Sequence, residues 1–104
     1  MVEFSGNITK CHQRLHDILV EFGFKVVDNA DFEPYKIDCY IDDIKLGFEA
    51  DGKGYHWKKR DAKRDAFILE NYRVKILRIT DKDLLDKKMQ DDVKNRILEF
   101  VKNG

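Results

Sequence analysis

Residues 35–51 read YKIDCYIDDIKLGFEAD, and the alternation within this stretch decides the fold. Every second residue is apolar in residues 35–41, and the same period returns in residues 44–50. A period of two is typical of half-buried strands. The polar pair Asp42-Asp43 between the two runs indicates a tight turn, so the stretch predicts an antiparallel hairpin.

The parity of this hairpin places three carboxylates on one face. A two-residue turn would set Asp38 opposite Gly47 and Lys36 opposite Glu49, and a four-residue turn keeps the parity. Directly opposed residues project on the same side of a sheet, so Asp38, Glu49 and Asp51 share a face. Gly47 is expected to leave open space between them. Such like charges repel, which favours a bound cation; the alternative is a solvated face balanced by lysines.

The other segments predict helices and strands around the hairpin. We expect helices over about residues 8–22 (capped by Asn7 or Ser5) and 57–71, a helical region capped by Asp81 or Asp83, short strands at 24–27 and 73–80, and a loop at 28–34. A strand–helix–strand crossover makes strand 73–80 parallel to the Glu49 strand, and apolar residues on both its faces indicate a central strand. The predicted fold is α/β, a small mixed β-sheet flanked by helices in the order αβββαβα.

Each predicted helix has an expected buried side. These sides comprise Ile8, Cys11, Leu15, Ile18, Leu19 and Phe22 in the first helix, Ala62, Ala66 and Leu69 with Phe67 or Ile68 in the second, and Leu85, Met89, Val93, Ile97 and Phe100 or Val101 in the last.

An ordered set of polar residues crosses the hairpin and the following helix. Asp38, Glu49-Ala50-Asp51-Gly52, His56 and Asp61-x-x-Arg64-Asp65 together resemble the pattern of the PD-(D/E)XK nuclease superfamily. Within it, the set is similar to the very-short-patch-repair-like branch, which includes EDxHD-type catalytic domains of phage homing endonucleases. The resemblance covers roughly residues 8–80. It departs from the superfamily at Asp51, where lysine is usual, and by one extra residue before His56.

The resemblance implies a restriction-endonuclease-like fold and metal-dependent hydrolysis of phosphodiester bonds in double-stranded DNA. Asp38, Glu49 and Asp51 would hold Mg²⁺ or Mn²⁺, since these ions prefer hard oxygen ligands. His56, oriented by Asp61, would move a proton, because a histidine titrates near neutrality. The bland alternative is a histidine that only hydrogen-bonds a turn.

Basic residues cluster beside this predicted site, with five of them in positions 58–64. Lys58, Lys59 and Arg64 are the expected phosphate contacts, and the alternative is a solvated helix surface. In the first helix, His12 and His16 have the i, i+4 spacing of metal ligands but lack a third ligand. The favoured interpretation is therefore a polar flank of an amphipathic helix, and an intermediate one is that His12 borders the active site.

The composition bounds the remaining expectations. The 104 residues include twenty basic and twenty acidic side chains, so the formal net charge is zero. A domain that binds DNA alone usually has a basic surplus, so either the basic residues gather on one face or the DNA-binding part lies elsewhere. We favour the second and expect residues 1–104 to be a single catalytic module of a homing or repair-type endonuclease. Its DNA-recognition part would lie on another segment or chain, and a homodimer is compatible with this. The competing class is an inactive nuclease-like nucleic-acid-binding or assembly module.

Two cysteines outside any C-x-x-C motif, Cys11 and Cys39, predict reduced thiols in a cytoplasmic protein. The resemblance to phage homing endonucleases is compatible with a phage-encoded protein. No apolar run in the sequence approaches the length of a membrane span.

Overall fold

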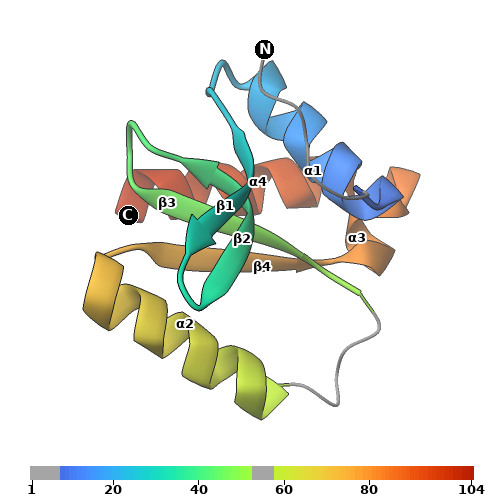
Figure 1. Ribbon diagram of the computed structural model, residues 1–104. Coiled ribbons are helices and arrows are strands. Elements are labelled where there is room, and N and C mark those ends of the chain that lie inside the picture. Colours follow the sequence, from blue (N-terminus) through green and yellow to red (C-terminus); the bar gives the residue numbers. More distant parts are fainter. Residues whose placement is uncertain (1–7, 53–57) are drawn as a thin grey trace.

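A four-stranded sheet lies between helices in the computed structural model, which describes residues 8–52 and 58–104 (Figure 1). The elements in chain order are α1 (Lys10–Glu21), β1 (Val27–Phe32), β2 (Tyr35–Ile41), β3 (Leu46–Asp51), α2 (Lys58–Tyr72), β4 (Lys75–Thr80), α3 (Asp81–Leu85), the 3₁₀ turn η2 (Lys87–Met89) and α4 (Gln90–Asn103). The strands lie in the order β1-β2-β3-β4, antiparallel except for the parallel β3–β4 pair. The predicted α/β class is confirmed.

The predicted hairpin forms between β2 and β3, with a four-residue turn over residues 42–45. Ile41 pairs with Leu46, and Ile44 lies in the turn rather than in the strand. This register corrects the predicted opposition of Lys36 to Glu49. Lys36 instead pairs with Asp31 of β1, and its Nζ lies 2.9 Å from the Asp31 Oδ1.

Residues 28–34, predicted to be a loop, contain most of β1. The strand predicted at 24–27 does not form apart from Val27, the first residue of β1. β1 reads VDNADF and buries only Ala30 and Phe32, so it lacks the apolar alternation that marks a strand. It lies at the edge of the sheet and needs a partner on one side only, which backbone pairing with β2 supplies.

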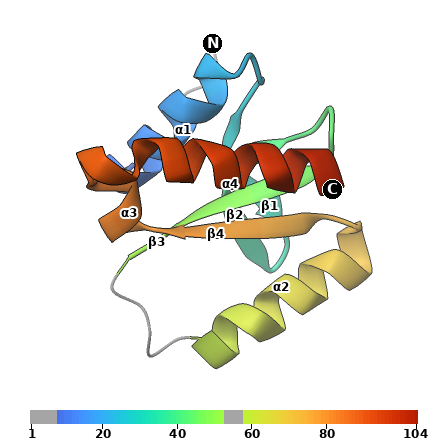
Figure 2. The ribbon, with the colours of Figure 1, turned by 180° about the vertical axis from the view of Figure 1, so that it is seen from behind.

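One face of the sheet packs against α1, α3 and α4 in an apolar core, and Figure 2 shows α4 lying across this face. Phe48 of β3 is fully buried there, with its ring centroid 5.5 Å from that of Phe100. The N-cap of α1 is Thr9, whose hydroxyl accepts a hydrogen bond from the His12 amide, and not the predicted Asn7 or Ser5. None of the helices in residues 8–52 and 58–104 is long and apolar enough to cross a membrane.

The carboxyl-terminal region differs from the prediction in its phase. It breaks at Asp86 into α3, η2 and α4, and Thr80 rather than Asp81 or Asp83 caps α3. The break shifts the buried stripe, so Leu84 is fully buried while Leu85 is exposed. Val93 and Ile97 are buried as expected.

Strand β4 is parallel to β3, as predicted, but it forms an edge of the described sheet rather than its centre. Both of its faces are nevertheless covered. Ile79 packs in the core with α1 and α4, and Ile76 packs beside the smaller apolar cluster that includes Ile68 of α2. Cover on both faces explains why the apolar pattern resembled that of a central strand.

Candidate active site

Strand β2 changes the face it presents at Asp38. Ile37 packs in the apolar cluster on the α2 side, whereas Cys39 packs in the core on the α1 side. Residues two apart in a regular strand point the same way, so the backbone twists sharply between them. The paired residues of β2 and β3 run from Ile41–Leu46 to Cys39–Phe48.

Beyond the last backbone pair, Cys39–Phe48, the side chains of Asp38 and Glu49 connect β2 and β3 at this twist. The Asp38 amide donates to the Glu49 Oε2 at 2.6 Å, and the Ala50 amide donates to the Asp38 Oδ2 at 3.0 Å. Each acidic side chain thus satisfies a backbone donor on the opposite strand, a charge-assisted arrangement. The predicted proximity of Asp38 to Glu49 is therefore present, and Asp38 is held by the backbone of β3.

Gly47 does not leave the open space that was predicted between the carboxylates. A Cβ added there would lie 3.0 Å from the Ile37 Cγ2 and 3.3 Å from the Ile76 Cγ1. The missing side chain therefore makes room for Ile37 on the α2 side of the sheet.

Helix α2 presents charged residues to the sheet instead of the predicted apolar stripe. Ala62, Ala66 and Leu69 are exposed, which corrects the expected buried face, and Ile68 is the one fully buried residue described in this helix. Asp61, Arg64 and Asp65, which lie on the same side of the helix as Ile68, are partly buried. The Arg64 Nη2 donates to the Glu49 Oε1 at 2.6 Å. The helix is turned this way because β3 and β4 offer charged partners.

Arg78 of β4 joins the carboxylates into one network. It binds Asp65 through two hydrogen bonds, from Nε at 2.8 Å and from Nη2 at 2.6 Å. Its Nη1 donates to the Asp51 Oδ1 at 2.8 Å and lies 3.5 Å from the Asp61 Oδ2. One guanidinium therefore positions three acidic side chains from β3 and α2.

Among the described residues, the contacts given above join five carboxylates (Asp38, Glu49, Asp51, Asp61 and Asp65) to two guanidinium groups, those of Arg64 and Arg78, which leaves a surplus of negative charge. Burial, followed by the charge of Asp38, raises the pKa of Glu49 above its ordinary value, although Arg64 opposes the shift. For Arg78, burial alone would lower the pKa, but its bonds to Asp65 and Asp51 raise it. The surplus is the electrostatic condition under which a cation would be attracted.

The fit to a divalent cation rests on donor chemistry. The Asp38 Oδ1 and the Asp51 Oδ2 accept no hydrogen bond from the residues that the structure describes, and both are hard oxygen donors. In residues 8–52 and 58–104, however, the three predicted ligands do not form a group of side chains close enough together to hold a metal ion. The guanidinium groups of Arg64 and Arg78 bind Glu49 and Asp51 instead. Metal binding by this set stays a prediction.

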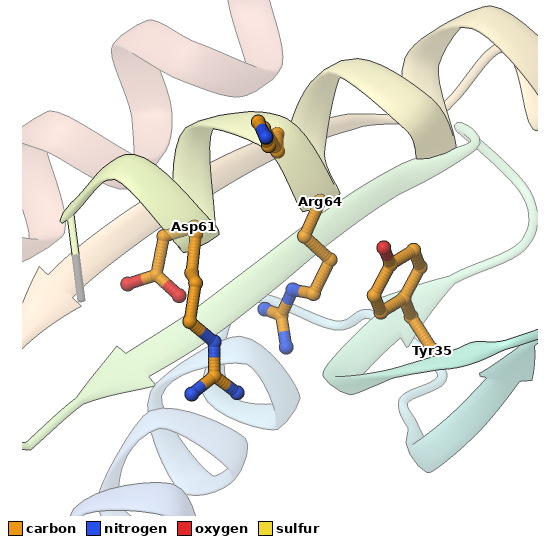
Figure 3. Close-up of a pocket in the computed structure, with 5 residues that line it drawn as sticks. Tyr35, Asp61 and Arg64 are labelled. Atoms are coloured by element: carbon orange, nitrogen blue, oxygen red, sulfur yellow. The ribbon is translucent and has the colours of Figure 1, made fainter.

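A pocket of about 240 Å³ opens beside the network, lined by Tyr35, Arg60, Asp61, Lys63 and Arg64. Figure 3 shows Asp61 and Arg64 extending from α2 and the Tyr35 ring beside the Arg64 guanidinium. The Arg64 Nε is buried without a hydrogen-bond acceptor in the described part of the chain, so the Arg64 guanidinium has an N–H group left to donate. The pocket thus combines basic groups with an edge of the carboxylate network.

The structure locates the remaining predicted residues only in part. Lys59 is exposed in the first turn of α2, and Lys58 begins this helix. His56 and Trp57 lie outside the described residues, so the predicted proton transfer by His56 stays a prediction. His12 is only 4% exposed, which shows that the polar-flank interpretation is wrong for it. Cys11 and Cys39 are free thiols, as predicted.

Arg78 and Asp65 belong to stretches that fit the resemblance, Tyr72-x-Val74-x-x-x-Arg78 and Asp61-x-x-Arg64-Asp65, but the sequence pattern gave neither a separate role and gave Asp28 none. Arg78 could have been identified from the sequence, since it occupies the same strand parity as the apolar residues Val74 and Ile76. A charge at an inward-facing strand position usually has a buried partner. Asp28 carried none, because its segment was predicted to be a loop.

A comparison with solved structures gives a match that covers most of the chain. The structure is similar to that of the homing endonuclease I-Bth0305I catalytic domain, with a TM-score of 0.68 and 25% sequence identity. The match covers 89% of this chain and 94% of that one. Neither a scan against protein-family models nor a search of curated proteins gives a match. The similarity supports a nuclease-like fold over most of the chain.

Proposed function

We propose that residues 1–104 form the catalytic domain of a DNA endonuclease that hydrolyses phosphodiester bonds. The observation that carries this proposal is the reciprocal link between Asp38 and Glu49, at the twist of β2 and beside the Arg64–Arg78 network. The likeness to a homing endonuclease catalytic domain supports it. A homing or repair-type enzyme of the EDxHD kind, in the very-short-patch-repair-like branch of the PD-(D/E)XK superfamily, is the finer assignment that we infer.

Asp38, Glu49 and Asp51 would hold a Mg²⁺ or Mn²⁺ ion, which when bound supplies charge neutralisation and activates water. The chain's own residues position this set. Hydrogen bonds from the backbone orient Asp38 and Glu49, and Arg78 orients Asp51. Asp61 is held near Arg78 at the start of α2. His56, which follows β3 in the sequence, would donate or accept the proton at the cleaved bond.

Basic residues around the pocket would bind the DNA backbone. Lys63 and Arg60 line the pocket with Arg64, and Lys58 and Lys59 precede them in the first turn of α2. Arginine and lysine side chains neutralise phosphates, so binding should weaken steeply as salt concentration rises. With zero formal charge on the chain, we infer that sequence recognition needs a further segment or chain, in a protein that acts in the cytoplasm.

A second function has a specific observation in its favour. Arg64 and Arg78 already pair with Glu49 and Asp51, so the face is partly neutralised without a cation. This arrangement would suit a nuclease-like module that binds nucleic acid without cutting it. A plasmid-cleavage assay distinguishes the two functions.

The test is incubation of supercoiled plasmid with the purified chain, with Mg²⁺, with Mn²⁺ and with EDTA. An endonuclease nicks or linearises the plasmid in the presence of metal, and the Asp38→Asn variant should lose this activity. Asparagine keeps an oxygen that accepts from the Ala50 amide, so folding should be preserved. Asp43→Asn, in the exposed turn, is the matched control and should cut like the parent.

His56→Ala should slow cleavage by about 10²–10⁴-fold, the usual contribution of a positioned acid or base, without weakening metal binding. Binding of DNA without cleavage under every metal condition would favour the inactive module. Cleavage by Asp38→Asn at the parent rate would contradict the assigned site.

A further inference from the structure

Four potential metal ligands gather on the α1 side of the sheet, on the other face of β2 from the carboxylate network. Asp28 of β1 lies between two histidines of α1, with its Oδ1 2.7 Å from the His12 Nε2 and its Oδ2 2.9 Å from the His16 Nδ1. The Cys39 thiol donates to the same carboxylate at 3.8 Å. The ligand atoms of His12, Asp28 and Cys39 all lie within 4.8 Å of one another.

The Asp28 carboxylate is unusually deeply buried for an acidic side chain. The side chain of Asp28 is 2% exposed, and among the described residues no lysine or arginine forms an ion pair with it. A buried carboxylate needs hydrogen-bond donors or a cation, because its desolvation is costly. Histidine N–H groups or a bound cation can meet this need at Asp28, and the types of ligand atom around it indicate which cation would fit.

We propose that His12, His16, Asp28 and Cys39 form a Zn²⁺ site that joins α1 to the β1–β2 pair. Zn²⁺ favours four ligands of imidazole nitrogen, thiolate sulfur and carboxylate oxygen in a tetrahedron. Two neutral imidazoles, one carboxylate and one thiolate carry two negative charges, which balance those of the ion. Binding displaces the proton of the Cys39 thiol and any proton shared between Asp28 and a histidine.

The distances require only small adjustments. Tetrahedral Zn²⁺ with bonds of 2.0–2.3 Å places ligand atoms about 3.3–3.8 Å apart, so the histidines would move slightly away from Asp28. His16 lies outside the group of three, but its Nδ1 is already 2.9 Å from the Asp28 Oδ2. Cys39 directly follows Asp38, so a bound ion would anchor β2 at its twist. This site does not depend on the proposed nuclease activity.

The test titrates the purified full chain, without an affinity tag, with Co²⁺ as a spectroscopic probe and with Zn²⁺ as competitor. The parent should show a thiolate-to-cobalt charge-transfer band that Zn²⁺ removes, and Zn²⁺ should raise its melting temperature. Cys39→Ser should lose the band. Cys11→Ser, the matched cysteine control, and Asp51→Asn, from the carboxylate network, should keep it.

His16→Gln provides a second variant should Cys39→Ser fail to fold, since His16 is partly exposed. It should weaken Zn²⁺ binding by at least about 10–100-fold, the loss seen when even an outer-sphere partner of a metal site is removed. Three results would overturn the proposal: no band and no thermal shift in the parent, a band that persists in Cys39→Ser, or Zn²⁺ affinity that is unchanged in His16→Gln.

Discussion

The two faces of the four-stranded sheet differ in what holds their helices. The face toward α1 and α4 is an apolar core in which Phe48 and Ile79 are fully buried. The face toward α2 has a smaller apolar cluster and the charged network of Glu49, Asp51 and Arg78. Hydrophobic burial is non-directional, whereas paired charges require specific geometry. The first face therefore contributes stability mainly through apolar burial, and the second fixes the geometry of its charged side chains.

Strand β3 connects both faces residue by residue. Leu46 and Phe48 belong to the apolar core, while Gly47 and Glu49 alternate with them on the α2 side. A single strand thus anchors the candidate site to the most deeply buried part of the protein. Substitutions on its two sides should consequently have different effects.

The largest loss of stability is expected for Phe48→Ala. Removing a fully buried phenylalanine loses transfer free energy and leaves a cavity, so the free energy of unfolding should fall by about 3–5 kcal/mol. Phe67→Ala, on the exposed side of α2, should cost less than about 1 kcal/mol, mainly from its edge contact with Tyr35. Urea unfolding of both variants measures the difference. Equal losses would contradict the division of the two faces.

A smaller loss is expected for Arg78→Gln. The change leaves Asp51 and Asp65 without their main positive partner, at a side chain that is only 18% exposed. We expect a loss of about 2–3 kcal/mol, below that of a fully buried pair because solvent screens the site partly. Arg96→Gln, which removes a more exposed pair with Asp83 and Asp92, should cost less than about 1 kcal/mol. Similar losses in urea unfolding would show that the network does not depend on Arg78.

The next effect concerns packing at Gly47. In Gly47→Ala the new methyl group meets Ile37 and Ile76 at 3.0–3.3 Å, so the free energy of unfolding should fall by about 1–2 kcal/mol. Gly52→Ala is the matched control, because nothing lies within 4 Å of a Cβ added at this position. It should change the free energy of unfolding by no more than about 0.5 kcal/mol. Thermal melts compare the two. A neutral Gly47→Ala would show that Ile37 adjusts without cost.

The smallest effect is a change in pH dependence at Glu49. Its raised pKa means that the folded protein favours the neutral carboxyl, so the stability it contributes is full below pH 4.5 and is lost as the pH rises through the raised pKa. Glu49→Gln removes this titration. The free energy of unfolding of the parent relative to the variant should therefore decrease from pH 4.5 upward in urea unfolding. A difference that increases with pH would mean that Arg64 dominates and lowers the pKa.

Much of the architecture was predictable because it depends on local pattern. The alternation in residues 35–41 and 46–51 predicted two paired strands, and parity survived the change from a two-residue to a four-residue turn. The edge strand β1 was not predictable in this way, since it buries only Ala30 and Phe32. Its pairing comes from backbone hydrogen bonds, which are the same for any sequence.

The candidate site was predictable in its members more than in its contacts. The spacing of Asp38, Glu49 and Asp51 indicated a shared face, but the position of Arg78 depends on the parallel register of β4. The rotation of α2 is likewise a tertiary result. Ala62 and Leu69 favoured one buried side by hydrophobicity, but charge pairing turned Arg64 and Asp65 toward the sheet.

By itself the sequence determined the α/β class, the hairpin and the carboxylates on it, because periodicity and parity act over a few neighbouring residues. Only the tertiary structure decided which cations those carboxylates meet and that Asp28 lies between His12 and His16. Contacts between residues far apart in sequence depend on how whole elements pack. Twist, register and helix rotation set them jointly, and no local pattern encodes their sum.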